Sequence, residues 1–146
     1  MTVHVAEAPV LDPLLVANAA AELAELRRLR AVAAAAAQGR TQRDIAARLD
    51  ISQSAVYKML VRARHTPGLF ELTPWEVVLR YAAGEISHDA MLEELRAWTW
   101  TRDRFLDADS PEPEQFVAGN WHDLDRAVRF GYLTDDDFDA AVERVR

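Results

Sequence analysis

The sequence predicts an all-α protein, with a tri-helical N-terminal unit followed by a small acidic helical domain of four or five short helices. Helix-start signals, a Ser or Thr before an apolar run, recur along the 146 residues. Apolar residues recur at three- and four-residue spacings, as on one face of a helix. No stretch combines sustained two-residue alternation with β-branched residues, so a sheet is not expected.

The first predicted element is a long Ala-rich helix. It begins near Leu14 or Ala21 and runs to Gln38, with Gly39 as its C-cap. Leu23, Leu26, Leu29 and Val32 place apolar groups along one side. We expect this side to pack across the two shorter helices that follow.

The second predicted element is a short amphipathic helix that starts after Thr41. Thr41 followed three residues later by Asp44 indicates a capping box, which satisfies free backbone N–H groups at a helix start. Ile45, Ala46 and Leu49 then share one apolar face. The helix is therefore expected to be half buried.

The third predicted element is a helix over about residues 53–63, joined to the second by a tight turn. Asp50 lies where the chain must turn, and Ser52 can cap the new helix. Ile51 and Val56 are placed to form a hydrophobic staple, which would fix the angle between the two helices. The inward residues of the third helix are predicted to be Val56, Met59 and Leu60.

Charge and aromatic content both divide the chain near residue 68. Residues 1–68 carry nine Lys and Arg against six Asp and Glu, whereas residues 69–146 carry eight against eighteen. Eleven of the twelve aromatic residues lie at or beyond Phe70. Pro67 and Gly68 form a turn-rich junction between the two parts. We therefore predict two domains, residues 1–66 and residues 69–146.

The second domain contains further helix signals. Thr73, Pro74 and Glu76 begin a helix expected to stop at Gly84, and Ser87 caps another. Residues 107–115 are an acidic loop that contains proline. The last two predicted helices are one ending at Gly131, with Trp121, Leu124, Val128 and Phe130 as its apolar residues, and one capped by Thr134, with Phe138, Ala141, Val142 and Val145 inward.

The outer face of the third helix carries hydrogen-bonding and cationic side chains. Its exposed residues are predicted to be Gln53, Ser54, Tyr57, Lys58 and Arg62. Amide and hydroxyl groups can read base edges in a DNA groove, while Lys and Arg neutralise phosphates. This face is therefore a candidate DNA-reading surface.

Residues 22–65 resemble the helix-turn-helix of phage repressors and related bacterial regulators. Ala46 stands at the close-packed small position and Val56 at the buried position of the recognition helix. Asp50 stands where the family usually has glycine, because the backbone there tends to be left-handed, a conformation that Asp tolerates better than most residues. The resemblance covers under a third of the chain and implies DNA binding.

The predicted DNA-binding site comprises eight polar residues of this motif. Gln53, Ser54 and Tyr57 are assigned to bases, Gln42, Arg43, Lys58 and Arg62 to phosphates, and Ser52 to the start of the recognition helix. The cations Arg27, Arg28 and Arg30 on the first helix are open to two interpretations, a solvated helix face or a further DNA contact.

The formal net charge of −7 does not exclude DNA binding. Residues 40–65 carry six basic residues against two acidic ones. Phosphate attraction is screened within about 8 Å at physiological salt, so the local positive patch decides. The acidic half is expected to point away from the duplex or to bind a basic partner.

No enzymatic, metal or cofactor site is predicted. The chain has no cysteine, and its four histidines show no metal-ligand spacing. Asp135, Asp136 and Asp137 follow Thr134 in the first turn of a helix, where the helix dipole favours acids. The start of the chain lacks the features of a signal peptide, and residues 31–37 are too short to span a bilayer. We expect a cytoplasmic protein without a membrane partner.

Three functions remain open from the sequence. The first is a sequence-specific transcriptional regulator, a repressor, that binds double-stranded DNA through residues 1–66 and two half-sites as a homodimer, with residues 69–146 as the dimerisation domain. The second follows from an organisation that resembles bacterial antitoxins, in which residues 69–146 would bind and neutralise a basic protein partner. The third is a scaffold for other proteins, whose helix-turn-helix no longer binds DNA. The first two functions could coexist in one chain.

Overall fold

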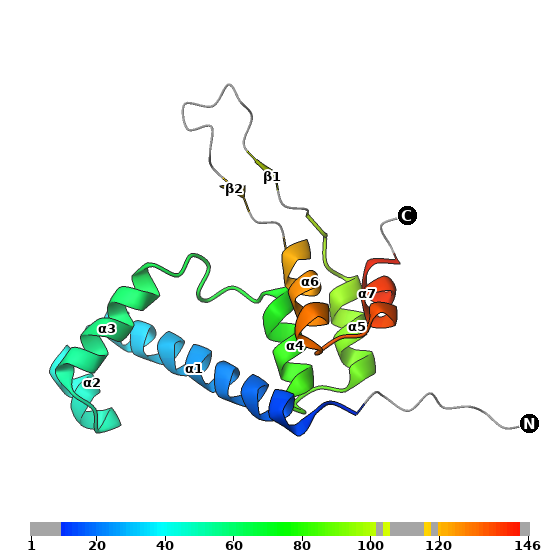
Figure 1. The fold of residues 1–146 in the computed structure, drawn as a ribbon. Helices are drawn as coiled ribbons and strands as arrows, with labels where there is room; N and C mark the ends of the chain where they lie inside the picture. Colours follow the sequence, from blue (N-terminus) through cyan, green and yellow to red (C-terminus); the bar gives the residue numbers. More distant parts are fainter. Residues whose placement is uncertain (1–9, 102–103, 106–115, 118–119, 144–146) are drawn as a thin grey trace, which may run out of the picture. The chain divides into compact units, whose positions relative to one another are not determined.

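Figure 1 shows the fold in a computed structural model, which describes residues 10–101, 104–105, 116–117 and 120–143. These residues are almost entirely helical, so the predicted all-α class is confirmed. The described helices are α1 (Pro13–Ala37), α2 (Gln42–Leu49), α3 (Gln53–Arg64), α4 (Pro74–Ala82), α5 (His88–Arg96), α6 (Trp121–Phe130) and α7 (Asp135–Val142).

One antiparallel pairing of two-residue strands accompanies the helices among the described residues. Strand β1 (Arg104–Phe105) pairs with β2 (Phe116–Val117). Strands of two residues are too short to show two-residue alternation, so the sequence does not predict them. The predicted acidic loop 107–115 falls outside the described residues, as does Val145.

The chain divides into two compact units, one of residues 21–71 and one of residues 1–20 with 72–146. The start of α1 thus belongs with the C-terminal helices. Ala19 is fully buried, and the Asn18 side-chain amide donates to the Tyr132 hydroxyl at 2.9 Å. These units differ from the predicted domains 1–66 and 69–146, because nothing in the sequence of α1 marks a break at residue 20. Independent folding of the two predicted domains stays a prediction.

Three helices enclose the core of the unit of residues 21–71. Val32 comes from α1, Ile45 and Ala46 from α2, and Val56 from α3. The partly buried residues packed against this cluster are Ala35, Ala36, Ile51, Met59 and Leu60. The predicted inward face of α3 is therefore confirmed, and Ile51 and Val56 lie in one cluster as the predicted staple requires.

The turn between α2 and α3 has the predicted left-handed backbone. Asp50 has φ 54° and ψ 47°, and it is the one non-glycine residue with positive φ in the described part of the chain. The Ile51 N–H donates to the Ala46 carbonyl at 3.0 Å, and the Asp50 N–H donates to the Ala47 carbonyl at 3.4 Å. This pattern is a Schellman motif, which ends α2 and fixes the direction of the chain into α3.

Local side-chain caps start both short helices. The Thr41 hydroxyl accepts from the Asp44 N–H at 3.1 Å, and the Ser52 hydroxyl accepts from the Ala55 N–H at 3.0 Å. One prediction for α2 was wrong: Leu49 is 39% exposed and does not join the buried face. It is the last residue of α2, where the chain turns away.

The segment after α3 folds back onto the same unit. Leu69 is buried, and the Arg30 guanidinium donates to the carbonyls of Leu69 at 2.6 Å and Glu71 at 3.3 Å. Arg30 is thus a structural side chain that holds the segment of residues 66–71 against α1.

Helices α4 to α7 form the other unit. Helix α4 packs against α5 and α6, and α7 packs against α5 and α6 (Figure 1). The fully buried side chains of this unit include Val77, Leu79, Met91, Leu95 and Leu124. The predicted helix bounds are close to those observed, although Phe130 is 55% exposed and not inward.

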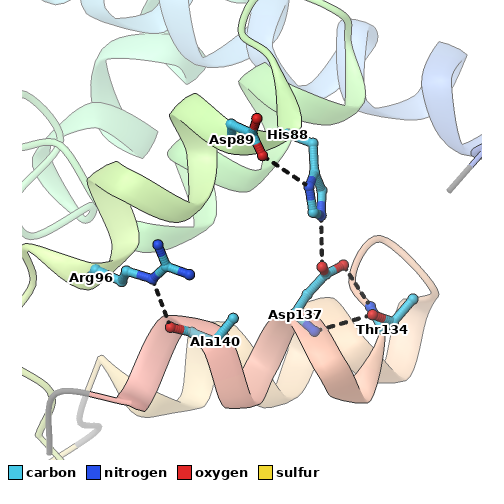
Figure 2. A network of polar contacts seen from close by, with 6 residues as sticks. All are labelled: His88, Asp89, Arg96, Thr134, Asp137 and Ala140. Atoms are coloured by element: carbon cyan, nitrogen blue, oxygen red, sulfur yellow. Dashed lines mark hydrogen bonds and ion pairs between the residues drawn. The ribbon is translucent and has the colours of Figure 1, made fainter. Parts of the chain in front are cut away.

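A polar network joins α5 to α7 (Figure 2). His88 Nε2 lies 2.6 Å from Asp137 Oδ1, while Asp137 Oδ2 accepts from the Thr134 N–H at 3.1 Å and the Thr134 hydroxyl accepts from the Asp137 N–H. Thr134 and Asp137 therefore form a capping box at the start of α7. Burial, and then the nearby Asp137 carboxylate, raise the pKa of Tyr81, whose ring contacts His88.

Candidate nucleic-acid interface

The structure places all eight predicted DNA-binding residues on the surface of one unit. Gln42 and Arg43 form the first turn of α2, and Ser52 is the N-cap of α3. The other five lie on α3. All eight residues are exposed: Gln42, Arg43, Ser52, Gln53, Ser54, Tyr57, Lys58 and Arg62.

The exposure of α3 follows its helical period. Val56 is fully buried, and Tyr57, one residue later, is 53% exposed. Residues three or four apart share a face, so Ser54, Lys58 and Arg62 form one exposed row beside Gln53 and Tyr57. The core contact that holds α3 thus also determines which side chains it presents.

The dimensions of α3 suit a DNA groove. Twelve residues at a rise of 1.5 Å give a helix about 18 Å long. The major groove of B-DNA is about 12 Å wide and admits one helix. A helix of this length can lie in the groove and still extend cationic side chains to the flanking phosphates.

Lys58 and Arg62 are available to bind an anion. Within the described part of the chain, neither side chain makes an ion pair. The first turn of α3 holds no acidic residue, and its last turn holds Arg62 and Arg64. The exposed face of α3 therefore keeps its positive charge.

The start of each short helix adds backbone donors. The first N–H groups of a helix have no partner within it and favour an anion such as a phosphate. Gln42 and Arg43 carry two such N–H groups, immediately after the Thr41 cap. The Ser52 hydroxyl accepts from the Ala55 N–H and still has its own proton to donate.

The structure changes the cation assignments outside the predicted set. Arg30, one of the three ambiguous cations of α1, is bound to the carbonyls of Leu69 and Glu71. Arg40 and Arg64 are exposed in the same unit and were not assigned individually. The count of basic residues over 40–65 was the signal that could have found them.

Among the described residues, no group of three or more His, Asp or Glu side chains could hold a metal ion. The Asp137 carboxylate is instead engaged by His88 and the Thr134 N–H. None of the helices that the structure describes is long and apolar enough to cross a membrane.

Comparison with known proteins agrees with this geometry. No curated protein and no solved structure matches the chain at a significant level. Residues 22–66 match the family model of the homeodomain-like domain, and they include the end of α1 that packs on α2 and α3 as well as the turn at Asp50. Residues 22–66 are therefore similar to a homeodomain-like helix-turn-helix domain, and this similarity supports DNA binding by this part of the chain.

Proposed function

We propose that the protein is a sequence-specific transcriptional regulator that represses by occupying its operator through α3. The observation that carries this proposal is the exposed, unpaired row of polar and cationic side chains on α3. A fixed turn and two local caps hold this helix in a domain that matches a DNA-binding family.

The proposed roles follow side-chain chemistry. Gln53, Ser54 and Tyr57 contact bases at the start of α3, where a recognition helix enters the major groove. Lys58 and Arg62 bind phosphates farther along the same helix. Gln42, Arg43 and Ser52 bind phosphates through side chains and free N–H groups at the two helix starts. Repression needs no more than occupancy of the operator.

Fluorescence anisotropy with duplex DNA at two salt concentrations tests this function. We expect binding that weakens steeply with salt. Binding releases counterions from the DNA, and this release is less favourable at higher salt concentration. The double change Lys58→Ala with Arg62→Ala should reduce affinity at low salt about tenfold or more. Arg129→Ala, an exposed cation of α6, is the matched control and should have no effect. The proposal fails if the wild-type chain does not bind at low salt.

The charge of the other unit favours a second function, capture of a basic protein in the manner of an antitoxin. Residues 1–20 and 72–146 carry eight basic against nineteen acidic residues, a net of −11. Exposed acids include Asp135, Asp136 and Asp139 on α7. A polyanionic surface attracts a cationic partner and steers its approach.

The protein encoded by the adjacent gene is the partner to test in a pull-down. Changing Asp135, Asp136 and Asp139 together to Asn should weaken capture, because it removes three charges without removing the helix. The double Lys58 and Arg62 variant should capture the partner normally. Equal capture by all three proteins would argue against an acidic binding surface.

A further inference from the structure

A groove of about 630 Å³ lies within the unit of residues 21–71. Its walls are α1, the last turns of α3 and the segment of residues 66–71, and its surface is mostly apolar. The apolar side chains are Ala33, Ala36, Leu60, Ala63, Leu69 and Phe70. The matched homeodomain-like region ends at residue 66, so residues 67–71 of this wall lie outside it.

Phe70 lines this groove and is exposed. The residue is 63% exposed, although Leu69 beside it is buried. The Glu71 N–H donates to the Gly68 carbonyl at 2.9 Å, which closes a turn, and Arg30 holds the carbonyls on either side of Phe70. The backbone that carries the exposed ring is therefore held in place.

One cation and one anion line the same groove, Arg64 on α3 and Glu71 on the turn. Within the described residues neither side chain makes an ion pair or a side-chain hydrogen bond. The surface thus combines an exposed aromatic ring, an apolar hollow and two opposite charges.

These properties allow the surface to pair with a second copy of itself. In a two-fold symmetric dimer the same patch is used by both copies, so every projecting group must meet a hollow and every charge its opposite within that patch. We infer that this groove binds a second copy of the chain, with Phe70 of each copy entering the groove of the other and Arg64 of each meeting Glu71 of the other.

The inferred dimer extends the proposed function. Dimerisation itself does not depend on that function, but its role in reading two half-sites rests on it. The inference places self-association on the DNA-binding unit itself, whereas the sequence had suggested residues 69–146. The patch is small, so we expect a dimer that dissociates in the micromolar range. Two linked recognition helices would then read two half-sites.

Analytical ultracentrifugation of the full chain, without DNA, tests the inference. We expect reversible dimerisation of the wild-type chain as its concentration rises to about 100 μM. Phe70→Ala should weaken dimerisation about tenfold or more, since a buried aromatic dominates a small interface. Leu49→Ala removes an exposed apolar side chain elsewhere on the unit and is the matched control.

Charge reversal gives a test that does not depend on Phe70. Arg64→Glu and Glu71→Arg should each weaken dimerisation, because each brings like charges together across the two-fold axis. The double variant should recover it, and mixing the two single variants should give heterodimers with both opposite-charge pairs. Circular dichroism on each variant checks that it is folded.

The outcomes separate this inference from DNA binding. A wild-type chain that stays monomeric at all concentrations overturns it, as does a dimer unaffected by Phe70→Ala and by both charge reversals. A monomer whose melting temperature rises with free L-phenylalanine would identify the groove as a small-ligand site and also overturn it. A chain that dimerises as expected but binds no DNA leaves the dimer standing and refutes the repressor.

Discussion

The unit of residues 21–71 and the unit of helices α4 to α7 are stabilised in different ways. The first has a core cluster of Val32, Ile45, Ala46 and Val56, and its two short helices are oriented by a left-handed turn and two local caps. The second buries Met91, Leu95 and Leu124 and has polar bonds between α5 and α7. The candidate DNA-reading helix is thus oriented mainly by local signals, whereas the acidic unit is joined by polar contacts between helices far apart in the chain.

The folding of the acidic unit can be followed by itself, because this unit holds all the tryptophans of the chain. All four tryptophans lie at or beyond Trp75, so tryptophan fluorescence reports on the acidic unit alone. Far-ultraviolet circular dichroism reports on the helices of both units.

Val56→Asp should unfold the helix-turn-helix unit. Val56 is fully buried in a core of four residues, and an unpaired carboxylate there costs several kcal/mol. We expect loss of helical circular dichroism and of DNA binding, with tryptophan fluorescence unchanged. Tyr57→Asp, at the exposed neighbouring position, should keep the helices intact. Unfolding of the acidic unit as well would show that the two units fold as one.

Asp137→Ala should destabilise the acidic unit by about 2–3 kcal/mol. Asp137 is 5% exposed and joins the Thr134 cap to His88 on α5, so its removal leaves both partners without an acceptor (Figure 2). Urea unfolding followed by tryptophan fluorescence measures the loss. Asp139→Ala, an exposed acid of the same helix, should cost far less. Equal effects of the two changes would mean that the network does not stabilise the unit.

Asp50→Gly should stabilise the helix-turn-helix unit by about 0.5 kcal/mol. Asp50 has positive φ, which costs an L-residue energy that glycine does not pay, although glycine gains entropy in the unfolded chain. Asp50→Ala keeps the Cβ and removes the carboxylate, so it should bring no gain. Thermal unfolding followed by circular dichroism distinguishes the two variants. A loss of stability with Gly would show that the Asp50 side chain itself stabilises the turn.

The sequence predicted the features that depend on residues close to one another in the chain. The hydroxyls of Thr41, Ser52 and Thr134 each accept a hydrogen bond from the backbone N–H three positions later. Asp50 ends helix α2, which directly precedes it. The surface position of the five candidate site residues on α3 follows in the same way, because the buried residue Val56 fixes which face of α3 is turned inward. Their contacts with DNA stay a prediction.

The features that the sequence did not predict join residues far apart in the chain. Arg30 binds carbonyls about forty positions later, and His88 meets Asp137 across 49 positions. Asn18 meets Tyr132 across 114 positions, which assigns the start of α1 to the acidic unit. No local pattern encodes such pairs, because each depends on how whole helices pack. The groove beside Phe70 was missed for the same reason.

Asp123→Asn should change the pH dependence of the acidic unit more than its stability. The Asp123 carboxylate accepts from the Trp75 N–H at 3.3 Å at the start of α4. Burial raises the pKa of Asp123, although the Trp75 hydrogen bond and the charges of Arg126 and His122 oppose this effect. A raised pKa means that the folded unit holds this proton more tightly than the unfolded chain does.

The sign of the effect follows from that difference. The stabilisation from the bound proton is fully present below the unfolded pKa of Asp, about 3.9, and is lost as the pH rises through the folded pKa. Ionised Asp123 therefore costs stability at neutral pH, and Asn, which still offers an acceptor to Trp75, should gain a few tenths of a kcal/mol there.

Urea unfolding by tryptophan fluorescence at pH 4 and pH 7 measures this gain, which should shrink at the lower pH. Asp125→Asn, exposed on the same helix, should show no such change. A gain that is larger at pH 4 than at pH 7 would contradict the assignment of burial as the dominant cause, because the protonated carboxyl should differ least from the amide.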